Sequence, residues 1–284
     1  MKAYVMDAFS EKLFGGNQAG VALPECPLSD AMMQQIAAEF KHSETAFVTV
    51  NDDGSVTLRY FTPAGEVDLC GHATIASFAL LRQEGLIADG SHIAHTKASD
   101  LNIGVSGGTV WMDMAAPRLL RELGEDEWAA FYEAYGLTTA DRPEGLTPAI
   151  VSTGLADVML PVRDHDTLMR AVQNEAAVTA LSKKYDVTGV HMFCLGDGCT
   201  AYCSNYAPLY DIPEECATGT SNGALTYYLY LRGIVQPERE NVFLQGEHMN
   251  RPSEIRSRLY EQDGAVNVRV GGSAVMSMQC EVKI

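Results

Sequence analysis

The fold is decided by residues 66–86, EVDLCGHATIASFALLRQEGL. From position 71 until Arg82, the side chains are small or apolar nearly all the way around a helix. This pattern is typical of a helix that is enclosed on every side. We therefore expect a helix over residues 71–85 with a sheet wrapped around it.

A second stretch, residues 214–234, repeats this spacing as EECATGTSNGALTYYLYLRGI. Four positions match at an offset of 148 residues: Glu66 with Glu214, Gly71 with Gly219, Ala76 with Ala224, and Gly85 with Gly233. Four matches alone do not exclude coincidence, but they fall at the same point of each half of the chain. The repeat predicts an α+β fold of two similar, pseudo-symmetric halves, each a mostly antiparallel sheet wrapped around a central helix. We place the N-terminal half at residues 1–115, with the C-terminal strand 272–284 packed against it, and the C-terminal half at residues 116–271.

Hydrophobic periodicity and turn residues place further elements on either side of these helices. Residues 15–20 form a glycine-rich loop in this prediction, residues 88–108 a polar stretch, and Ser29 the cap of a helix. The expected strands are 3–8, 21–23, 46–50, 56–61, 109–114, 149–153, 157–162, 191–195, 199–206, 266–270 and 274–282, and the other expected helices are 29–40, 127–135 and 167–185.

The composition excludes several classes of protein. Hydrophobic residues make up 46% of the chain and charged residues 20%, as in globular proteins. The 20 Lys and Arg against 37 Asp and Glu give a net charge of −17, which repels nucleic acid and anionic lipid headgroups. No apolar stretch approaches the ~20 residues of a membrane span, and the N-terminus lacks a secretion signal. We therefore expect a cytoplasmic protein without nucleic-acid or membrane partners.

The 7 cysteines are expected to stay reduced, because their number is odd and no export signal is present. The densest group, Cys194, Cys199 and Cys203, lacks both the paired spacing and the fourth ligand of a zinc site. We expect these residues to be small apolar side chains of a hairpin. We expect no metal site at this group.

The two glycine-led helix starts predict a site for an anion. A helix N-terminus presents unpaired N–H groups and about half a positive charge, and glycine lets a ligand approach closely. If the two halves pack as a pseudo-twofold pair, both starts can hold one substrate carboxylate; the alternative is ordinary helix capping. The residues concerned are Gly71, His72 and Ala73 in the first copy, and Gly219, Thr220 and Ser221 in the second.

Glu44 is the candidate general acid and base. It lies where a helix is expected to end and an apolar strand to begin, and partial burial there raises a carboxyl pKa toward neutrality. The alternative is a solvated loop residue. His72 has the chemistry for a proton relay or for a hydrogen bond to a carbonyl, although a histidine at a helix start is often only a structural donor.

Cys70 and Cys216 suggest a different mechanism. Each stands just before a helix start, a setting that lowers a thiol pKa. Two thiols on opposite faces of a substrate suit racemisation, because one removes a proton and the other returns it. The repeat, however, aligns Cys70 with Thr218, and cysteine is also a common buried residue.

Several ordered motifs resemble the PhzF-like isomerases, a family named for phenazine biosynthesis. They are GNQAGV (16–21), HSETAF (42–47), RYFTP (59–63), DLCGHAT (68–74), TGTSNG (218–223) and GGSAV (271–275). The resemblance covers nearly the whole chain and implies the diaminopimelate-epimerase-like fold, with an active site between two similar halves. It also implies that the carboxylate of Glu44 moves a proton between carbons of a cyclic, amino-acid-like substrate without metal or organic cofactor. His72, Glu215 and backbone groups of both glycine-rich segments would line that site, and a homodimer is expected.

One segment departs from this family pattern. The family usually has Glu-Asp-Pro before x-Thr-Gly, whereas this chain has Glu214, Glu215 and Cys216 before Ala217-Thr218-Gly219. The segment is similar to the second catalytic-cysteine motif of diaminopimelate epimerases, Cys-x-Thr-Gly, and Cys70-Gly71 is similar to their first motif.

The leading prediction is a cofactor-independent isomerase that acts on a small anionic carboxylate or amino-acid-like substrate. Glu44 is its acid and base, His72 and Glu215 assist, and Asn17 and the two helix starts hold the substrate. The first alternative is an amino-acid racemase or epimerase that uses Cys70 and Cys216. The second is a non-catalytic protein that binds small molecules on the same scaffold.

Overall fold

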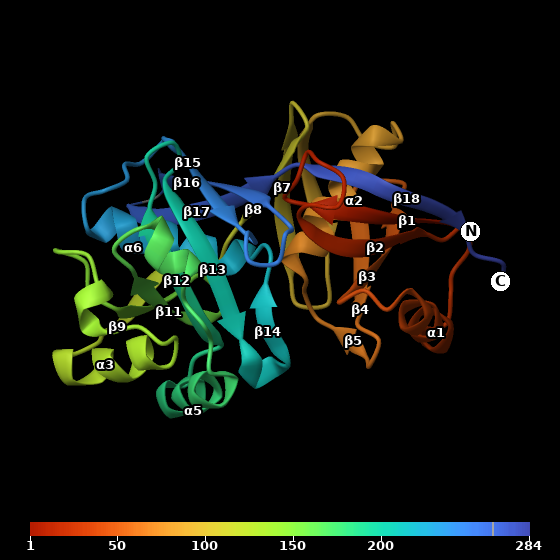
Figure 1. The fold of residues 1–284 in the computed structure, drawn as a ribbon. Helices are drawn as coiled ribbons and strands as arrows, with labels where there is room; N and C mark the ends of the chain where they lie inside the picture. The colour runs from red at the N-terminus through yellow and green to blue at the C-terminus, as the bar shows by residue number, and fades with distance from the viewer. Residues whose placement is uncertain (263) are drawn as a thin grey trace. The chain divides into compact units, whose positions relative to one another are not determined.

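The computed structural model describes residues 1–262 and 264–284. The chain divides into two compact units, Met1–Asp113 with Gly271–Ile284, and Met114–Val270. Each unit is a mostly antiparallel sheet curved around one central helix (Figure 1). The predicted α+β fold of two similar halves is therefore confirmed. Among the described residues, no helix has both the length and the apolar character that crossing a membrane requires.

The first unit surrounds the helix α2 (Gly71–Gln83), which contacts β1, β2, β3, β8 and β18. Every residue of α2 from His72 to Leu81 is buried, as its apolar circumference predicts. In the sheet, β1 pairs with β2 and β18, β2 is parallel to β3, and β4 pairs with β3, β5 and β6. The strands are β1 (Lys2–Ala8), β2 (Asn17–Leu23), β3 (Thr45–Val50), β4 (Val56–Phe61), β5 (Glu66–Val67), β6 (Gly90–His95), β7 (Asp100–Ser106), β8 (Thr109–Asp113) and β18 (Ala274–Glu281).

The second unit surrounds α6 (Gly219–Leu231), which contacts β9, β10, β11 and β16. Its sheet pairs β10 with β9 and β11, runs β12 parallel to β11, and pairs β13 with β12, β14 and β15. The strands are β9 (Arg118–Glu122), β10 (Ala149–Ser152), β11 (Ala156–Pro161), β12 (Gly189–Leu195), β13 (Ala201–Ala207), β14 (Ile212–Glu215), β15 (Glu240–Gln245), β16 (Ser253–Gln262) and β17 (Ala265–Gly272), which runs to the boundary of the unit.

The two units have the same strand order and the same pairing directions. The series β1 to β6 in the first unit corresponds, strand by strand, to β10 to β15 in the second, including the parallel pairs β2–β3 and β11–β12. The sequence repeat fits this order, because α2 and α6 have the same length and begin 148 residues apart. Gly85 and Gly233 follow the helix ends with φ of 69° and 72°, a left-handed conformation that favours glycine. The matched glycines are therefore the stop signals of two equivalent helices.

The outer helices cover the sheets with apolar faces. In the first unit α1 (Asp30–Phe40) is capped by Ser29, as predicted, and buries Met33, Ile36 and Ala37 against Phe47 and its neighbours. In the second unit α3 (Glu125–Glu133) and α5 (Glu175–Tyr185) lie together (Figure 1), and their side chains share one apolar core with β11 and β12. The remaining short elements are α4 (His165–Met169), η1 (Thr139–Asp141) and η2 (Pro208–Tyr210).

Several sequence-based boundaries were wrong. The expected loop at 15–20 is already strand from Asn17 onward, because β1 supplies the partner that the local pattern does not reveal. The polar stretch 88–108 contains β6 and β7, whose exposed side chains hide the strand periodicity. The helix expected at 167–185 is two helices, and Asn174 caps the second. The strands β15 and β16 were not predicted.

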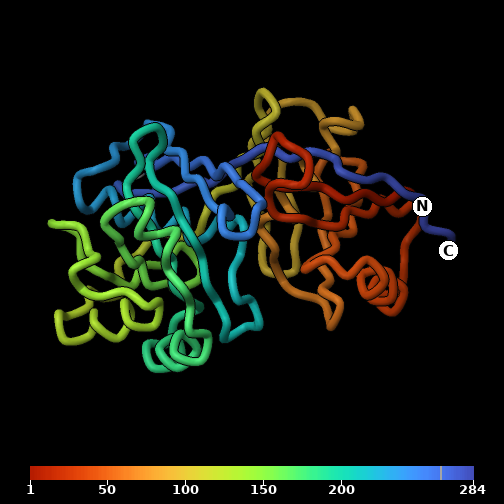
Figure 2. Tube along the Cα trace, viewed as in Figure 1, coloured from red at the N-terminus to blue at the C-terminus, as the bar shows by residue number. Residues whose placement is uncertain are grey.

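Both chain ends belong to the first unit and lie side by side (Figure 2). The strand β18 runs antiparallel to β1, with Glu281 opposite Lys2. The N–H of Val282 also donates to the carbonyl oxygen of Met1 at 2.9 Å. The last strand of the chain thus completes the sheet in which the first strand lies.

Candidate active site

Glu44 is placed by the junction of α1 with β3. The helix α1 stops at Phe40, because Lys41 adopts a left-handed conformation with φ of 57°. On the neighbouring strand β2, the N–H of Gly20 donates to the carbonyl oxygen of Glu44 at 3.0 Å. A Cβ atom on Gly20 would lie only 2.7 Å from Thr45 Oγ1, so glycine allows the close approach of β2 to β3. This junction fixes the backbone of Glu44.

Glu44, His72 and Cys70 come together in the first unit. His72 Nε2 lies 3.4 Å from Glu44 Oε2 and 3.4 Å from the hydroxyl oxygen of Ser43. Cys70 Sγ lies 3.4 Å from His72 Nδ1. The side chain of Glu44 is 21% exposed, whereas His72 and Cys70 are 8% and 7% exposed. The cluster is thus mostly withdrawn from water, and the carboxylate is its most accessible member.

Glu44 Oε2 is a buried acceptor for which, in the described part of the chain, no hydrogen-bond donor is in position. Buried carboxylate oxygens normally accept hydrogen bonds, and leaving one without a donor is costly. The imidazole of His72 is within ion-pair distance but does not meet hydrogen-bond geometry. This oxygen is therefore available to a proton or to another ligand.

The start of α2 is held firmly beside this carboxylate. Cys70 is the N-cap residue, and its carbonyl oxygen accepts a hydrogen bond from Thr74 Oγ1 at 2.7 Å. The hydroxyl of Tyr60 lies 2.7 Å from the same Thr74 oxygen. The first N–H groups of the helix, at Gly71, His72 and Ala73, have no partner within the helix. They form the positive end of a 13-residue helix next to the candidate base.

Asn17 begins β2 and is buried, opposite Ala8 of β1. The preceding residue, Gly16, has φ of 62°, and a Cβ atom there would lie 2.2 Å from the carbonyl oxygen of Ala8. The glycine of the motif is therefore required by a tight turn into β2. The structure places Asn17 in the same unit as Glu44.

In the second unit, Gln245 organises the approach to α6. Its Nε2 donates to the carbonyl oxygen of Glu215 at 2.7 Å and to Thr218 Oγ1 at 3.2 Å. Its Oε1 accepts from the N–H of Thr218 at 3.3 Å and from Asn222 Nδ2 at 2.8 Å. Thr218 also donates its hydroxyl hydrogen to Glu215 Oε2 in a very short bond. Glu215 is thus tied to the N-cap of α6.

A buried histidine extends this network. His191 Nε2 lies 3.3 Å from Asn222 Oδ1, and burial lowers the His191 pKa to about 4, so the ring is neutral at pH 7. Asn222 uses its Nδ2 to donate to Gln245 and to Thr218, so its Oδ1 accepts the Nε2 hydrogen of His191. The Nδ1 atom then carries no hydrogen. Asn205 Oδ1 is placed 3.2 Å from it, so the Asn205 amide must be turned over to present an Nδ2 hydrogen there instead.

Two further contacts fix the first turn of α6. The hydroxyl of Ser221 donates to Asp157 Oδ2 at 2.5 Å, and Thr153 Oγ1 donates to the carbonyl oxygen of Thr220 at 2.8 Å. Burial raises the pKa of the Asp157 carboxyl, while the bond from Ser221 works in the opposite direction. The residues Gly219, Thr220 and Ser221 thus form a rigid helix start within the second unit.

The sequence-based prediction of a lowered pKa for the Cys216 thiol was wrong. Burial raises the Cys216 pKa to about 11, and the nearby charge of Glu215 acts in the same direction. Cys216 also precedes the N-cap Thr218 by two residues, so it is not at the helix start itself. Gly246 packs on it so closely that a Cβ atom there would lie 2.8 Å from the Cys216 carbonyl oxygen. At pH 7 this residue is a protonated, buried thiol.

The same first-unit cluster could hold a metal ion. One ligand atom each from Glu44, Cys70 and His72 lie within 4.8 Å of one another.

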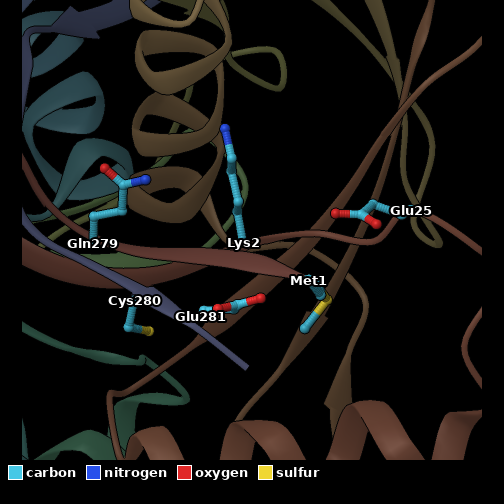
Figure 3. Close-up of a pocket in the computed structure, with 6 residues that line it drawn as sticks. All are labelled: Met1, Lys2, Glu25, Gln279, Cys280 and Glu281. Atoms are coloured by element: carbon cyan, nitrogen blue, oxygen red, sulfur yellow. The ribbon is translucent and has the colours of Figure 1, made fainter. Parts of the chain in front are cut away.

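A surface hollow of about 470 Å³ beside the chain ends contains no candidate catalytic residue (Figure 3). It is lined by Met1, Lys2, Glu25, Gln279, Cys280 and Glu281.

Sequence reasoning missed the residues that support both helix starts. The signal that could have found Gln245 is a polar residue at an inward position of a strand, since β15 buries alternate residues. Asp157 and His191 carry a different signal, a polar residue in strands (β11 and β12) that are buried along almost their whole length. No such signal marks Ser43, whose contact with His72 depends on the fold.

Comparisons with known proteins point to one family. The model of the family described as phenazine biosynthesis-like protein (PhzC-PhzF) matches residues 6–280. The "Uncharacterized isomerase YddE" of Escherichia coli K12 is 31% identical, over 99% of this chain and 97% of the relative.

Solved structures show the same likeness. The phenazine biosynthesis protein of the PhzF family from Bacillus anthracis is 27% identical and has a TM-score of 0.89. The alignment covers 100% of this chain and 99% of that protein. A probable proline racemase from Agrobacterium radiobacter K84 has a TM-score of 0.63, and the alignment covers 100% of this chain and 93% of that protein. Because the sequence identity is only 11%, this likeness concerns the fold alone.

Proposed function

Because this chain belongs to the phenazine biosynthesis-like protein family and is an isomerase, we propose that Glu44 carries out its proton transfer. The substrate is a small carboxylate or amino-acid-like molecule, and the reaction needs no cofactor. The observation that carries this proposal is Glu44 Oε2, a buried carboxylate oxygen without a positioned donor, 3.4 Å from His72 Nε2.

The reaction moves one hydrogen without changing the composition of the substrate. Glu44 takes a proton from a carbon next to a carbonyl or conjugated acid, and the electron pair of the broken C–H bond delocalises into that group. The carboxyl group of Glu44 then returns the proton to a different carbon or to the other face. A positioned acid or base of this kind contributes roughly 10²–10⁴-fold to a rate.

The start of α2 supplies the stabilisation that the intermediate requires. Negative charge develops on a substrate oxygen when the proton leaves, and the N–H groups of Gly71, His72 and Ala73 are donors at the positive end of a helix. Because Thr74 and Tyr60 hold the N-cap in place, these donors need little rearrangement. Removing one donor of this kind typically costs about 3 kcal/mol of transition-state stabilisation.

The second unit contributes another anchored helix start to this proposal. Glu215 assists the reaction, and Gly219, Thr220 and Ser221 bind polar groups of the substrate through backbone N–H groups and the Ser221 hydroxyl. This assignment is supported by the hydrogen bonds of Gln245 and Asp157, which fix the first turn of α6. Asn17 is retained as a substrate-binding residue because a tight turn sets its position.

The two-cysteine racemase has less support. A thiol must ionise to accept a proton from carbon, and burial raises the Cys216 pKa to about 11. The surroundings of Cys70 differ, because its sulfur lies 3.4 Å from a histidine nitrogen. We therefore assign Cys70 a role beside His72, and leave Cys216 out of the proton transfer.

Deuterium uptake at carbon tests the role of Glu44. The protein is incubated in D₂O with a panel of small α-amino, α-hydroxy and unsaturated carboxylic acids, and mass spectrometry detects deuterium in the recovered acids. For any acid that exchanges, Glu44→Gln should slow exchange by at least about 10²-fold, since the amide cannot accept a proton.

The matched control is Glu39→Gln, which removes an exposed carboxylate from the end of α1. It should exchange at the rate of the unchanged protein. Full exchange by Glu44→Gln would discard the proposed role of this residue. Loss of exchange in Glu39→Gln as well would show that the effect is not specific to position 44.

A homodimer and a cytoplasmic location are also proposed. The first is supported by the family resemblance, and the second by the 7 cysteines, an odd number that suits a reducing compartment. Sedimentation equilibrium of the purified chain and fractionation of cells that contain it test the two statements separately.

A further inference from the structure

We propose that Glu44, Cys70 and His72 form a binding site for one thiophilic divalent cation, with Zn²⁺ as the best match, and that the bound cation blocks proton transfer. The binding site is argued from the geometry of the three side chains. The block rests on the function proposed for Glu44.

The three side chains offer the ligand types that zinc prefers. Zinc in proteins is bound by cysteine sulfur, histidine nitrogen and carboxylate oxygen, and open sites use three protein ligands plus water. A soft thiolate favours Zn²⁺ over Mg²⁺ or Ca²⁺, which prefer sets of oxygen ligands. The mixed set in the first unit therefore indicates a thiophilic cation.

The three ligand atoms lie close enough together for side-chain rotation to place them around a tetrahedral ion. With metal–ligand bonds of about 2.0–2.3 Å, neighbouring ligand atoms of a tetrahedron lie roughly 3.3–3.6 Å apart. Here His72 Nε2 is 3.4 Å from Glu44 Oε2 and 3.9 Å from Cys70 Sγ. All three ligand atoms fall within 4.8 Å of one another. Side-chain rotations that shorten the longest of these separations by up to about 1.2 Å would close the site around an ion.

The charges of the site are compatible with such an ion. On binding, the S–H bond of Cys70 breaks and its proton passes to solvent, so thiolate and carboxylate together balance the two positive charges. The helix end repels the ion itself, and the net charge of −17 offsets part of that repulsion by attracting cations.

Binding would occupy the atom on which the proposed reaction depends. Glu44 Oε2 has no hydrogen-bond donor in position in the described structure, so a cation would take an oxygen that is available. Once bound to the ion, this oxygen can no longer accept a proton from carbon. The partial exposure of Glu44 gives the ion a route to the two buried ligands.

Cobalt and zinc titrations test the site directly. The background protein carries Cys26→Ser and Cys280→Ser, which remove the two exposed cysteines. We expect it to bind one Co²⁺ with a thiolate-to-cobalt charge-transfer band, and one Zn²⁺ should displace the cobalt. Adding Cys70→Ser should abolish the band and raise the Kd for Zn²⁺ by at least about 100-fold, more than the loss of an outer partner.

Two further variants test the other ligands. His72→Gln and Glu44→Gln should each raise the Kd for Zn²⁺ at least about tenfold while keeping the far-ultraviolet circular dichroism of the background protein. Glu39→Gln is the matched control and should bind as the background does. No charge-transfer band in the background protein, a band that survives Cys70→Ser, or unchanged affinity in both other variants would overturn the site.

These experiments distinguish failure of the proposed zinc block from failure of the function proposed for Glu44. If Zn²⁺ binds as expected and deuterium exchange continues at full rate with the ion bound, the proposed block is wrong. If Zn²⁺ binds as expected and Glu44→Gln retains full exchange in metal-free buffer, the cation site stands and the function proposed for Glu44 falls.

Discussion

Replacing Gln245 by leucine should destabilise the second unit without changing its shape. Gln245 is 1% exposed, and its side chain joins the end of β14 to the N-cap of α6. Leucine is close to glutamine in size but has no hydrogen-bonding group. The substitution therefore removes the hydrogen bonds and leaves little or no cavity.

The magnitude follows from the hydrogen bonds that are lost. The carbonyl oxygen of Glu215 and the N–H of Thr218 lose the partner that Gln245 provides, and Asn222 Nδ2 retains only its bond to the Thr218 carbonyl. Each hydrogen bond contributes roughly 0.5–1.5 kcal/mol to stability, so the loss of the four that Gln245 makes gives about 3 kcal/mol or somewhat more. For a unit of this size, roughly 2–4 °C per kcal/mol predicts a Tm lower by about 6–12 °C.

Tryptophan fluorescence can follow the second unit alone. The chain has 2 tryptophans, of which Trp128 lies in the core of the second unit and Trp111 in the first. In a Trp111→Phe background, thermal unfolding of Gln245→Leu is compared with Gln236→Leu, which changes an exposed glutamine of the same unit. The control should stay within about 0.5 kcal/mol. A decrease in Tm below about 2 °C for Gln245→Leu would refute the role assigned to the network.

Three other predictions follow from the structure. His191 has a pKa of about 4, against 6.5 in the unfolded chain, so the stability that its neutral ring contributes is complete above about pH 6.5 and is lost as the pH falls toward 4. The free energy of unfolding should decrease by about 2 kcal/mol between pH 7 and pH 5 for this reason. An NMR titration of the His191 ring with a midpoint above pH 6 would contradict this prediction. Cys216, whose pKa burial raises to about 11, should react with iodoacetamide far more slowly than the exposed Cys26 in the native protein, and equal labelling in a peptide map would count against its burial. Gly20→Ala should lower the free energy of unfolding by about 1–3 kcal/mol, because the new Cβ meets Thr45 Oγ1 at 2.7 Å, and an unchanged urea midpoint would disprove this close packing.

The enclosed helices were predictable because their signal is local. An apolar circumference and a terminal glycine define α2 and α6 without reference to any other segment, and the capped helix α1 has a similarly clear periodicity. The strands β6 and β7 were hidden because they pair with each other along a mostly exposed surface, where side chains need not alternate. Their hydrogen bonds, not their side chains, make them strands.

The candidate site was predictable residue by residue but not as an arrangement. Charge and position identified Glu44, His72 and Cys70 separately, whereas their spacing of 3.4 Å results from the pairing of β2 with β3 and the fixed N-cap of α2. The expectation for Cys216 failed for a related reason. Proximity to a helix start suggests a low pKa, but burial depends on segments far away in sequence, here the turn at Gly246.

The strand β18 has a consequence for the order in which the molecule assembles during synthesis. The first unit needs residues 274–281 to complete the sheet beside β1, whereas the second unit consists of the continuous stretch Met114–Val270. On the ribosome, the second unit therefore has all its strands before the first does. The N-terminal segments must wait, with one edge of β1 unpaired, until the C-terminal segment emerges.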